Sequence, residues 1–153
     1  MLLIAGAGAS MDWWEDGFCD RLAAGRRFVI RYDQRDTGRS VGYEPGAPGY
    51  GWDDLVLDAV GVLDALGVDR AHLVGMSMGG GIAQVAALDH PDRVATLTLV
   101  ATAPAAPGGD DPDLPPMADE ARARFAALAE PEWSDRAAVI DYLVGLERAC
   151  ARS

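Results

Sequence analysis

Ser77 is the residue best placed for chemistry, because it lies at the centre of Gly75-Met76-Ser77-Met78-Gly79. This G-x-S-x-G spacing is typical of a nucleophile elbow, a sharp turn from a strand into a helix that holds a serine in strained backbone geometry. The small flanking residues let the strand and the helix pack closely, and the helix N-terminus directs free N–H groups at the same point. The pattern predicts a serine that attacks carbonyl carbon atoms. The alternative is a serine that only caps the helix.

A second turn, Gly6-Ala7-Gly8, follows the first apolar run of the chain. In a parallel sheet of strand order 2-1-3-4, ligands bind where the crossovers leave strands 1 and 3 toward opposite faces. The turn and Ser77 would meet at this point. We therefore predict that the backbone N–H groups of Ala7 and Met78 form an oxyanion hole, which stabilises negative charge on a carbonyl oxygen.

The same turn partly matches a dinucleotide-binding fingerprint, because Gly6 and Gly8 follow one strand and Asp33 ends the next. The third glycine of G-x-G-x-x-G would fall where the chain has Met11. This departure, together with the elbow, makes dinucleotide binding the weaker interpretation.

Short apolar runs predict the strands that must position these residues, over residues 2–5, 27–32, 71–74 and 94–100. Amphipathic patterns predict helices over residues 12–24 and 52–66 and from the elbow to about residue 89. On the 52–66 helix, we expect one apolar face, made of Val56, Ala59, Val60, Leu63 and Leu66. The alternation of strands and helices predicts an α/β fold, with a parallel sheet whose two outer strands are open edges.

The composition changes after Val100. Residues 102–116 are rich in Pro, Gly and Asp, which predicts a solvated linker. Two further helices are expected over residues 117–129 and 135–149. The predicted organisation is an α/β core over 1–101, a linker over 102–116 and a helical segment over 117–153.

The composition of the 153-residue chain limits its class. A hydrophobic fraction of 50% and a charged fraction of 24% indicate one globular domain. A net charge of −11 argues against nucleic acid as a partner. The absence of an apolar run of ~18 residues argues against a membrane span. The N-terminus lacks the basic segment of a signal peptide, so a cytoplasmic location is expected. Cys19 and Cys150 show no metal-ligand spacing and are expected to be single buried thiols.

Three segments together resemble the α/β-hydrolase superfamily: GAGAS (6–10), YDQRDTGRS (32–40) and HLVGMSMGG (72–80). Within it, RFVIRYDQRDTGRS, GVDRAHLVGMSMGG and QVAALDHPDRV are similar to the aclacinomycin-methylesterase-like esterases. The resemblance implies Ser77 as nucleophile and Ala7 and Met78 as the oxyanion donors. The usual His-Gly before the oxyanion residue is Ala5-Gly6 here.

The resemblance also implies the activity, which is hydrolysis of a small hydrophobic carboxylic ester, including a methyl ester on a polycyclic compound. It implies no metal and no organic cofactor. It makes the segment after Val100 look like the start of a helical cap. Family members usually begin with a hairpin and end with two more strands that carry the catalytic acid and histidine, so the chain resembles the N-terminal portion of such an enzyme.

A serine hydrolase needs a histidine base that an acid orients, and neither histidine is well placed here. His72 lies five positions before Ser77, ~16 Å along a strand. His90 lies 13 positions after it, ~20 Å along a helix. The chain has no lysine, which excludes a Ser-Lys pair. We therefore expect the triad histidine and acid to be missing from this chain.

Three functional hypotheses follow. The first is an esterase whose missing half comes from another chain, as a complementing C-terminal half, or was lost by truncation. The open sheet edges could also pair copies of the chain into a homo-oligomer. The second is a non-catalytic remnant that binds small apolar ligands or a partner. The third is a cofactor-free haloperoxidase or perhydrolase that uses the same elbow.

Several other side chains have two interpretations each. Acidic and basic residues after the second strand are expected to organise the loop rather than to catalyse; they are Asp33, Arg35 and Asp36. Carboxylates after the fourth strand are expected to be solvated linker residues rather than a triad acid; they are Asp110, Asp111 and Asp113. Of Trp13 and Trp14, one is expected in the core and one at the surface, rather than both in an acyl pocket. Met76 and Met78 either shape the pocket or pack the elbow.

Overall fold

The computed structural model describes residues 1–44, 48–105 and 115–150. The chain forms two compact units that divide between residues 106 and 107. The first unit contains a four-stranded sheet of order β2-β1-β3-β4, and every pair is parallel. This is the predicted strand order. The strands are β1 (Leu2–Ile4), β2 (Ile30–Arg31), β3 (Ala71–Met76) and β4 (Val94–Val100).

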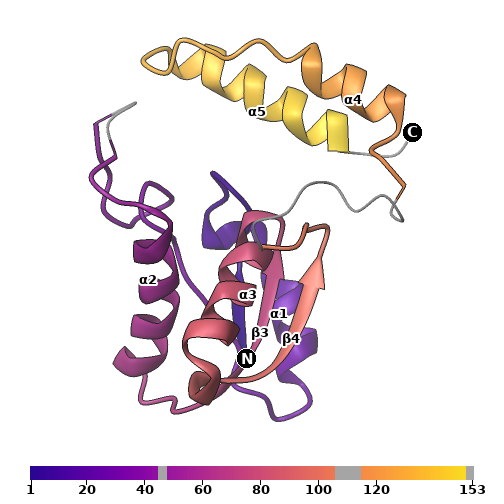
Figure 1. The fold of residues 1–153 in the computed structure, drawn as a ribbon. Helices are drawn as coiled ribbons and strands as arrows, with labels where there is room; N and C mark the ends of the chain where they lie inside the picture. The colour runs from indigo at the N-terminus through magenta and orange to yellow at the C-terminus, as the bar shows by residue number, and fades with distance from the viewer. Residues whose placement is uncertain (45–47, 106–114, 151–153) are drawn as a thin grey trace. The chain divides into compact units, whose positions relative to one another are not determined.

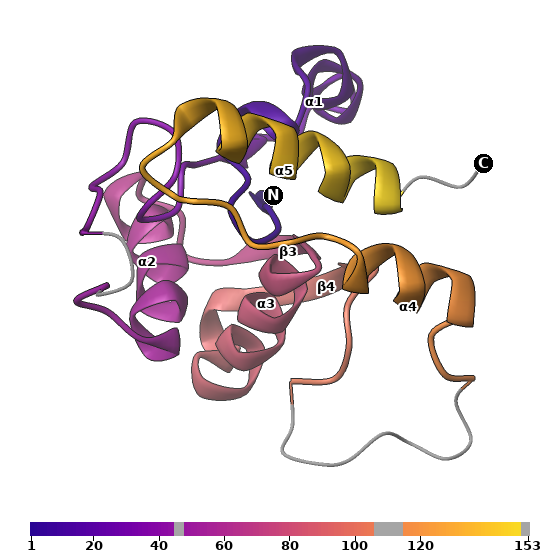
Figure 2. The same cartoon turned by 90° about the horizontal axis from the view of Figure 1, so that it is seen from above.

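Helices cover both faces of the sheet (Figure 1 and Figure 2). The helices α2 (Trp52–Ala65) and α3 (Met78–Asp89) pack on one face. Helix α1 (Asp16–Ala23) packs on the other. Strand β1 is therefore enclosed, and Leu2, Leu3 and Ile4 are fully buried. Burial on both faces explains why the central strands are continuous apolar runs rather than alternating ones.

The register of β1 against β3 places the two predicted site turns together. Ile4 pairs with Gly75, so both strands end at the same edge of the sheet. The Gly6-Ala7-Gly8 turn and the turn at Ser77 are therefore neighbours, as the strand order required.

The apolar face of α2 agrees with the predicted set in part: Leu55 is buried as well, Val60 is only partly buried, and the last position is exposed. Val56, Ala59 and Leu63 are buried, whereas Leu66 is 48% exposed. The reason is that α2 ends at Ala65, and Leu66 is already the C-cap residue. Periodicity alone extended the face by one position too far.

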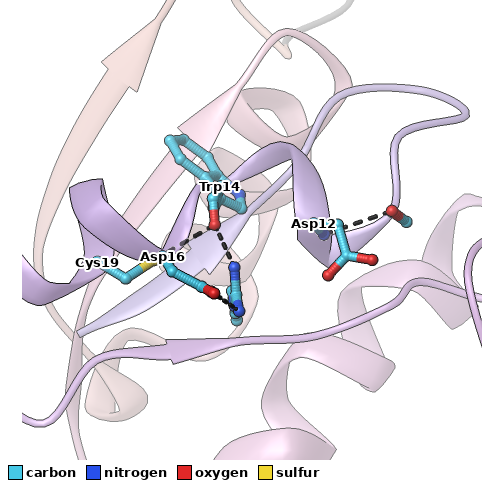
Figure 3. A network of polar contacts seen from close by, with 6 residues as sticks. Asp12, Trp14, Asp16 and Cys19 are labelled. Carbon is cyan, nitrogen blue, oxygen red and sulfur yellow. Dashed lines mark hydrogen bonds and ion pairs between the residues drawn. The ribbon is translucent and has the colours of Figure 1, made fainter.

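The prediction of one helix over residues 12–24 is wrong, because the helical conformation is interrupted near Trp14. A short 3-10 helix spans Met11–Trp13, and α1 begins only at Asp16. The guanidinium of Arg31 donates to the Trp14 carbonyl and also binds the Asp16 carboxylate at 2.5 Å. The Cys19 thiol donates to the same carbonyl, and Figure 3 shows Trp14, Asp16 and Cys19 at this point of the chain. A carbonyl held by β2 in this way is not available to continue a helix.

Two further predictions need correction. The second strand was expected over residues 27–32, but β2 contains two residues because β1 offers it pairs at Leu2 and Leu3 alone. The cysteines were expected to be buried, but Cys150 is exposed and Cys19 is partly buried. Cys19 packs against the cluster under α1, which is the set of buried residues on that face of the sheet: Leu3, Ala5, Trp14 and Val74.

The second unit contains the helices α4 (Asp119–Ala126) and α5 (Arg136–Cys150), which pack together. Gly145 of α5 lies close to Leu128, just beyond the end of α4, because a Cβ there would be 2.8 Å from the Leu128 Cδ2. Trp133 and Tyr142 make an edge-on ring contact at 5.8 Å between centroids. Asp110, Asp111 and Asp113 lie outside the described residues. Within the described ranges, every helix is too short or too polar to cross a bilayer.

Candidate active site

Ser77 sits at the junction of β3 and α3 in a left-handed backbone conformation, with φ 50° and ψ −119°. Such a conformation is strained for any residue with a side chain, and it persists only where the surroundings fix it. The flanking glycines are required by close packing. A Cβ at Gly75 would lie 2.2 Å from the Gly79 carbonyl oxygen, and one at Gly79 would lie 2.3 Å from the Ile4 oxygen. The predicted sharp turn between a strand and a helix is present.

Hydrogen bonds fix both peptide groups of Ser77. Its N–H donates to the Val100 carbonyl at 3.0 Å. Its carbonyl accepts from the N–H of Gly80 at 2.9 Å, from the N–H of Gly81 at 3.2 Å and from the Thr102 hydroxyl at 2.8 Å. The backbone is therefore held, while the residue itself is exposed.

The segment after β4 is tied to the start of α3. Ala101 also has a left-handed φ, 46°. The Gln84 amide donates to the Ala103 carbonyl at 3.0 Å and accepts from the Ala105 N–H at 3.1 Å. These bonds keep residues 101–105 beside Ser77.

The Gly6-Ala7-Gly8 turn forms the other wall of the site. The Ala9 N–H donates to the Gly6 carbonyl at 3.3 Å, and Gly8 has φ 69°. A Cβ at Gly6 would lie 3.6 Å from the Ser77 Cβ, so this turn lies against the turn at Ser77.

The two predicted oxyanion donors both lack an acceptor. Within the described residues, neither the Ala7 N–H nor the Met78 N–H makes a hydrogen bond. Unpaired donors on two turns beside a hydroxyl are the arrangement that stabilises an oxyanion.

A pocket of about 330 Å³ opens beside Ser77. Its walls are largely apolar and include Trp52, Met78, Ala101 and Pro104. The Trp52 ring lies against α3, because a Cβ at Gly81 would be 3.0 Å from it. Of the two methionines, Met78 lines this pocket, whereas Met76 packs into the cluster under α1.

The two histidines of the chain lie at the ends of β3 and α3 that are remote from Ser77, as expected. His72 lies near the start of β3, where its ring contacts the hydroxyl of Thr96 and that of Thr98, the latter at 3.0 Å. Burial lowers the pKa of His72. His90 is the C-cap residue of α3, at the end of the helix opposite Ser77. Neither ring is placed to take a proton from the hydroxyl.

The charged residues after β2 organise their loop. The Arg35 guanidinium makes two hydrogen bonds of 2.6 Å to the Asp58 carboxylate on α2, which raises the pKa of Arg35. It also lies over the Tyr50 ring at 5.1 Å. The Asp36 carboxylate accepts from the Tyr43 N–H at 2.6 Å. These contacts fit the predicted network rather than a catalytic role.

Trp13 and Trp14 divide as predicted. Trp14 is buried and stacks on Phe18 at 5.8 Å, whereas Trp13 is exposed. Both line a surface hollow of about 600 Å³ with Asp12 and Glu15. This hollow does not include Ser77 among its walls.

Sequence reasoning missed three polar side chains that hold the site, namely Gln34, Gln84 and Thr102. Gln34 donates to the Ala5 carbonyl at 2.9 Å, just before the oxyanion turn. No local pattern marks these residues, because each bonds to backbone far away in the sequence.

The chain belongs to the α/β-hydrolase family, since the family model for the alpha/beta hydrolase fold matches residues 1–149. Among curated proteins, it is similar to rhodomycin D methylesterase DauP of Streptomyces sp. (strain C5), with 54% identity over 100 residues. Rhodomycin D methylesterase DnrP of Streptomyces peucetius is 51% identical over 100 residues. Each match covers 65% of this chain and 34% of the relative. The chain thus spans about a third of the length of these relatives.

Solved structures agree with this assignment. A hydrolase from Pseudomonas aeruginosa is 34% identical with a TM-score of 0.59, covering 87% of this chain and 46% of that one. An N-acyl homoserine lactone degrading enzyme is 28% identical with a TM-score of 0.60, covering 98% of this chain and 57% of that one. The resemblance to esterases of this fold is confirmed.

Proposed function

We propose that this chain carries the nucleophile and the oxyanion donors of a carboxylic-ester hydrolase. The Ser77 Oγ attacks the ester carbonyl, and the N–H groups of Ala7 and Met78 donate to the oxygen that becomes negative. The C–O bond to the alcohol then breaks, which leaves an acyl-serine that water hydrolyses. The observation that carries the proposal is the strained Ser77 backbone beside the N–H groups of Ala7 and Met78, which have no acceptor among the described residues.

The proposed substrate is a small hydrophobic ester. The pocket beside Ser77 offers Trp52, Met78 and alanine side chains, which suit an apolar group. Two similar proteins are named rhodomycin D methylesterases, which supports a methyl ester as one substrate class.

We further propose that the proton acceptor and its orienting acid come from a complementing C-terminal half. Neither His72 nor His90 is near Ser77. Because the matched relatives are about three times as long as the matched segment, there is room in such proteins for both groups.

Imidazole rescue tests the proposal on the 153-residue chain. Added imidazole supplies the missing base, so hydrolysis of p-nitrophenyl butyrate is expected to rise with imidazole more steeply for the native chain than for Ser77→Ala. The variant measures the reaction of imidazole with the ester directly. Equal slopes would refute a nucleophilic Ser77 and favour the non-catalytic remnant. Halogenation that requires both peroxide and Ser77 would instead support the haloperoxidase hypothesis.

A further inference from the structure

Gln34 is the one polar residue that is buried in the described ranges, with a relative exposure of 2%. Its amide nitrogen donates to the Ala5 carbonyl at 2.9 Å, and its amide oxygen has no partner among the described residues. The nitrogen must face Ala5, because the opposite orientation would set two oxygens against each other. Burying an amide whose oxygen has no hydrogen-bond partner is unfavourable. The arrangement therefore calls for a role that offsets this cost.

The Ala5 carbonyl is a junction between the two halves of the site. It belongs to the last buried residue before the oxyanion turn, and Ala5 itself is 1% exposed. A Cβ at Gly79 would lie 2.5 Å from this oxygen, so the start of α3 packs directly on it. Gln34 thus holds the peptide that contacts both the turn and the elbow helix.

Asp33 holds the other end of the same turn. Its carboxylate accepts from the Met11 N–H at 2.7 Å and from the Arg39 N–H at 3.0 Å. These hydrogen bonds lower the pKa of Asp33. Two adjacent residues after β2 therefore clamp residues 5 and 11, and the oxyanion turn is the chain between them.

We propose that Gln34 is a positioning residue of the oxyanion hole, which fixes the Ala5 peptide and thereby aims the Ala7 N–H at the oxygen bound beside Ser77. Asp33 closes the clamp at Met11. This inference rests on the proposed function, because it presumes that Ala7 donates to an oxyanion. Gln34 touches no reacting atom, so its substitution is expected to affect one oxyanion donor and spare the other.

Phosphonylation of the full chain separates the two donors. A fluorophosphonate reacts with Ser77 in the presence of imidazole: the Oγ–P bond forms, fluoride leaves and imidazole takes the hydroxyl proton. The phosphonyl oxygen then occupies the oxyanion position. In the ¹⁵N-labelled native chain, the amide proton resonances of Ala7 and Met78 are both expected to move downfield as they hydrogen-bond to it.

Gln34→Met removes the donor and keeps the length of the side chain. In this variant, the Ala7 shift on phosphonylation is expected to fall below half of its native value, while the Met78 shift is retained. Gln84→Met is the matched control, since it removes an amide that ties the 103–105 segment to α3 and makes no contact with the turn. It should leave the Ala7 shift unchanged.

Gln34→Glu is the second variant. Burial raises the pKa of such a carboxyl, and the protonated acid can donate to the Ala5 carbonyl, so the Ala7 shift should recover as the pH is lowered. An undiminished Ala7 shift in Gln34→Met or Gln34→Glu at high pH would overturn the positioning role and leave the proposed function standing. A native chain in which Ser77 stays unmodified, or in which neither amide responds, would overturn the proposed function and this inference with it.

Discussion

Gly79→Ala is expected to destabilise the protein, although alanine favours helices. The new Cβ would lie 2.3 Å from the Ile4 oxygen and 2.5 Å from the Ala5 oxygen. Both oxygens belong to or adjoin a strand that is buried between neighbours, so α3 must withdraw by about 1 Å to reach ordinary van der Waals separation. Overpacking of this kind costs ~1–3 kcal/mol, and the helix propensity of alanine offsets up to ~1 kcal/mol of it. We expect a net loss of about 1–2 kcal/mol in the free energy of unfolding.

Urea unfolding, followed by circular dichroism, measures this change, and Gly61→Ala is its matched control. Gly61 lies in α2 with open space where its Cβ would project, so the same substitution should stabilise by about 0.5–1 kcal/mol. The two substitutions are thus expected to shift the urea midpoint in opposite directions. If Gly79→Ala raised the midpoint as Gly61→Ala does, the close approach of α3 to β1 would be wrong. The withdrawal of α3 should also lower imidazole-dependent hydrolysis, because it moves the Met78 N–H away from the Ala7 N–H, the other proposed oxyanion donor.

Three further changes have defined outcomes. Ala101→Gly should increase the free energy of unfolding by up to ~1 kcal/mol and so raise the urea midpoint, because φ 46° is strained for alanine; a lower midpoint would contradict this. Asp33→Asn should be less stable than the native protein at neutral pH. On acidification, its melting temperature should fall by less than that of the native protein. The folded pKa of Asp33 is lowered, so its contribution is present above the unfolded value of about 3.9 and is lost as the pH falls through the folded pKa; parallel pH curves for the two proteins would refute it. Arg35→Lys should cost about 1 kcal/mol, since one ammonium cannot replace two hydrogen bonds to Asp58, and an unchanged midpoint would count against that pair.

The parts of the fold that sequence predicts well are those with strong local signals. The strands β3 and β4 and the helices α2 and α3 begin within a residue of their predicted starts, because apolar runs and glycine or proline stops mark them. The break before α1 was missed because its cause is Arg31, a residue 17 positions away from the carbonyl that it binds. The length of β2 was missed because its partner strand sets it, not its own residues.

The site shows the same division between local and distant causes. Ser77 and its two glycines lie within five consecutive residues, so their spacing alone predicts the turn. The residues that hold the site act at longer range: Thr102 bonds to the Ser77 carbonyl across 25 positions of sequence, and Gln34 bonds to the Ala5 carbonyl across 29. Nothing in a single sequence distinguishes these side chains from other polar loop residues, and their role follows from topology.

The sheet register has a consequence for the order of folding. The strained elbow is closed by contacts among β3, α3 and β4, which are consecutive in the chain, so its loops are short and inexpensive to close. The oxyanion turn reaches the same place only when Ile4 pairs with Gly75, which closes a far longer loop. The turn at Ser77 is thus expected to take shape early in folding. The proposed oxyanion hole is completed only with the late docking of the N-terminal strand.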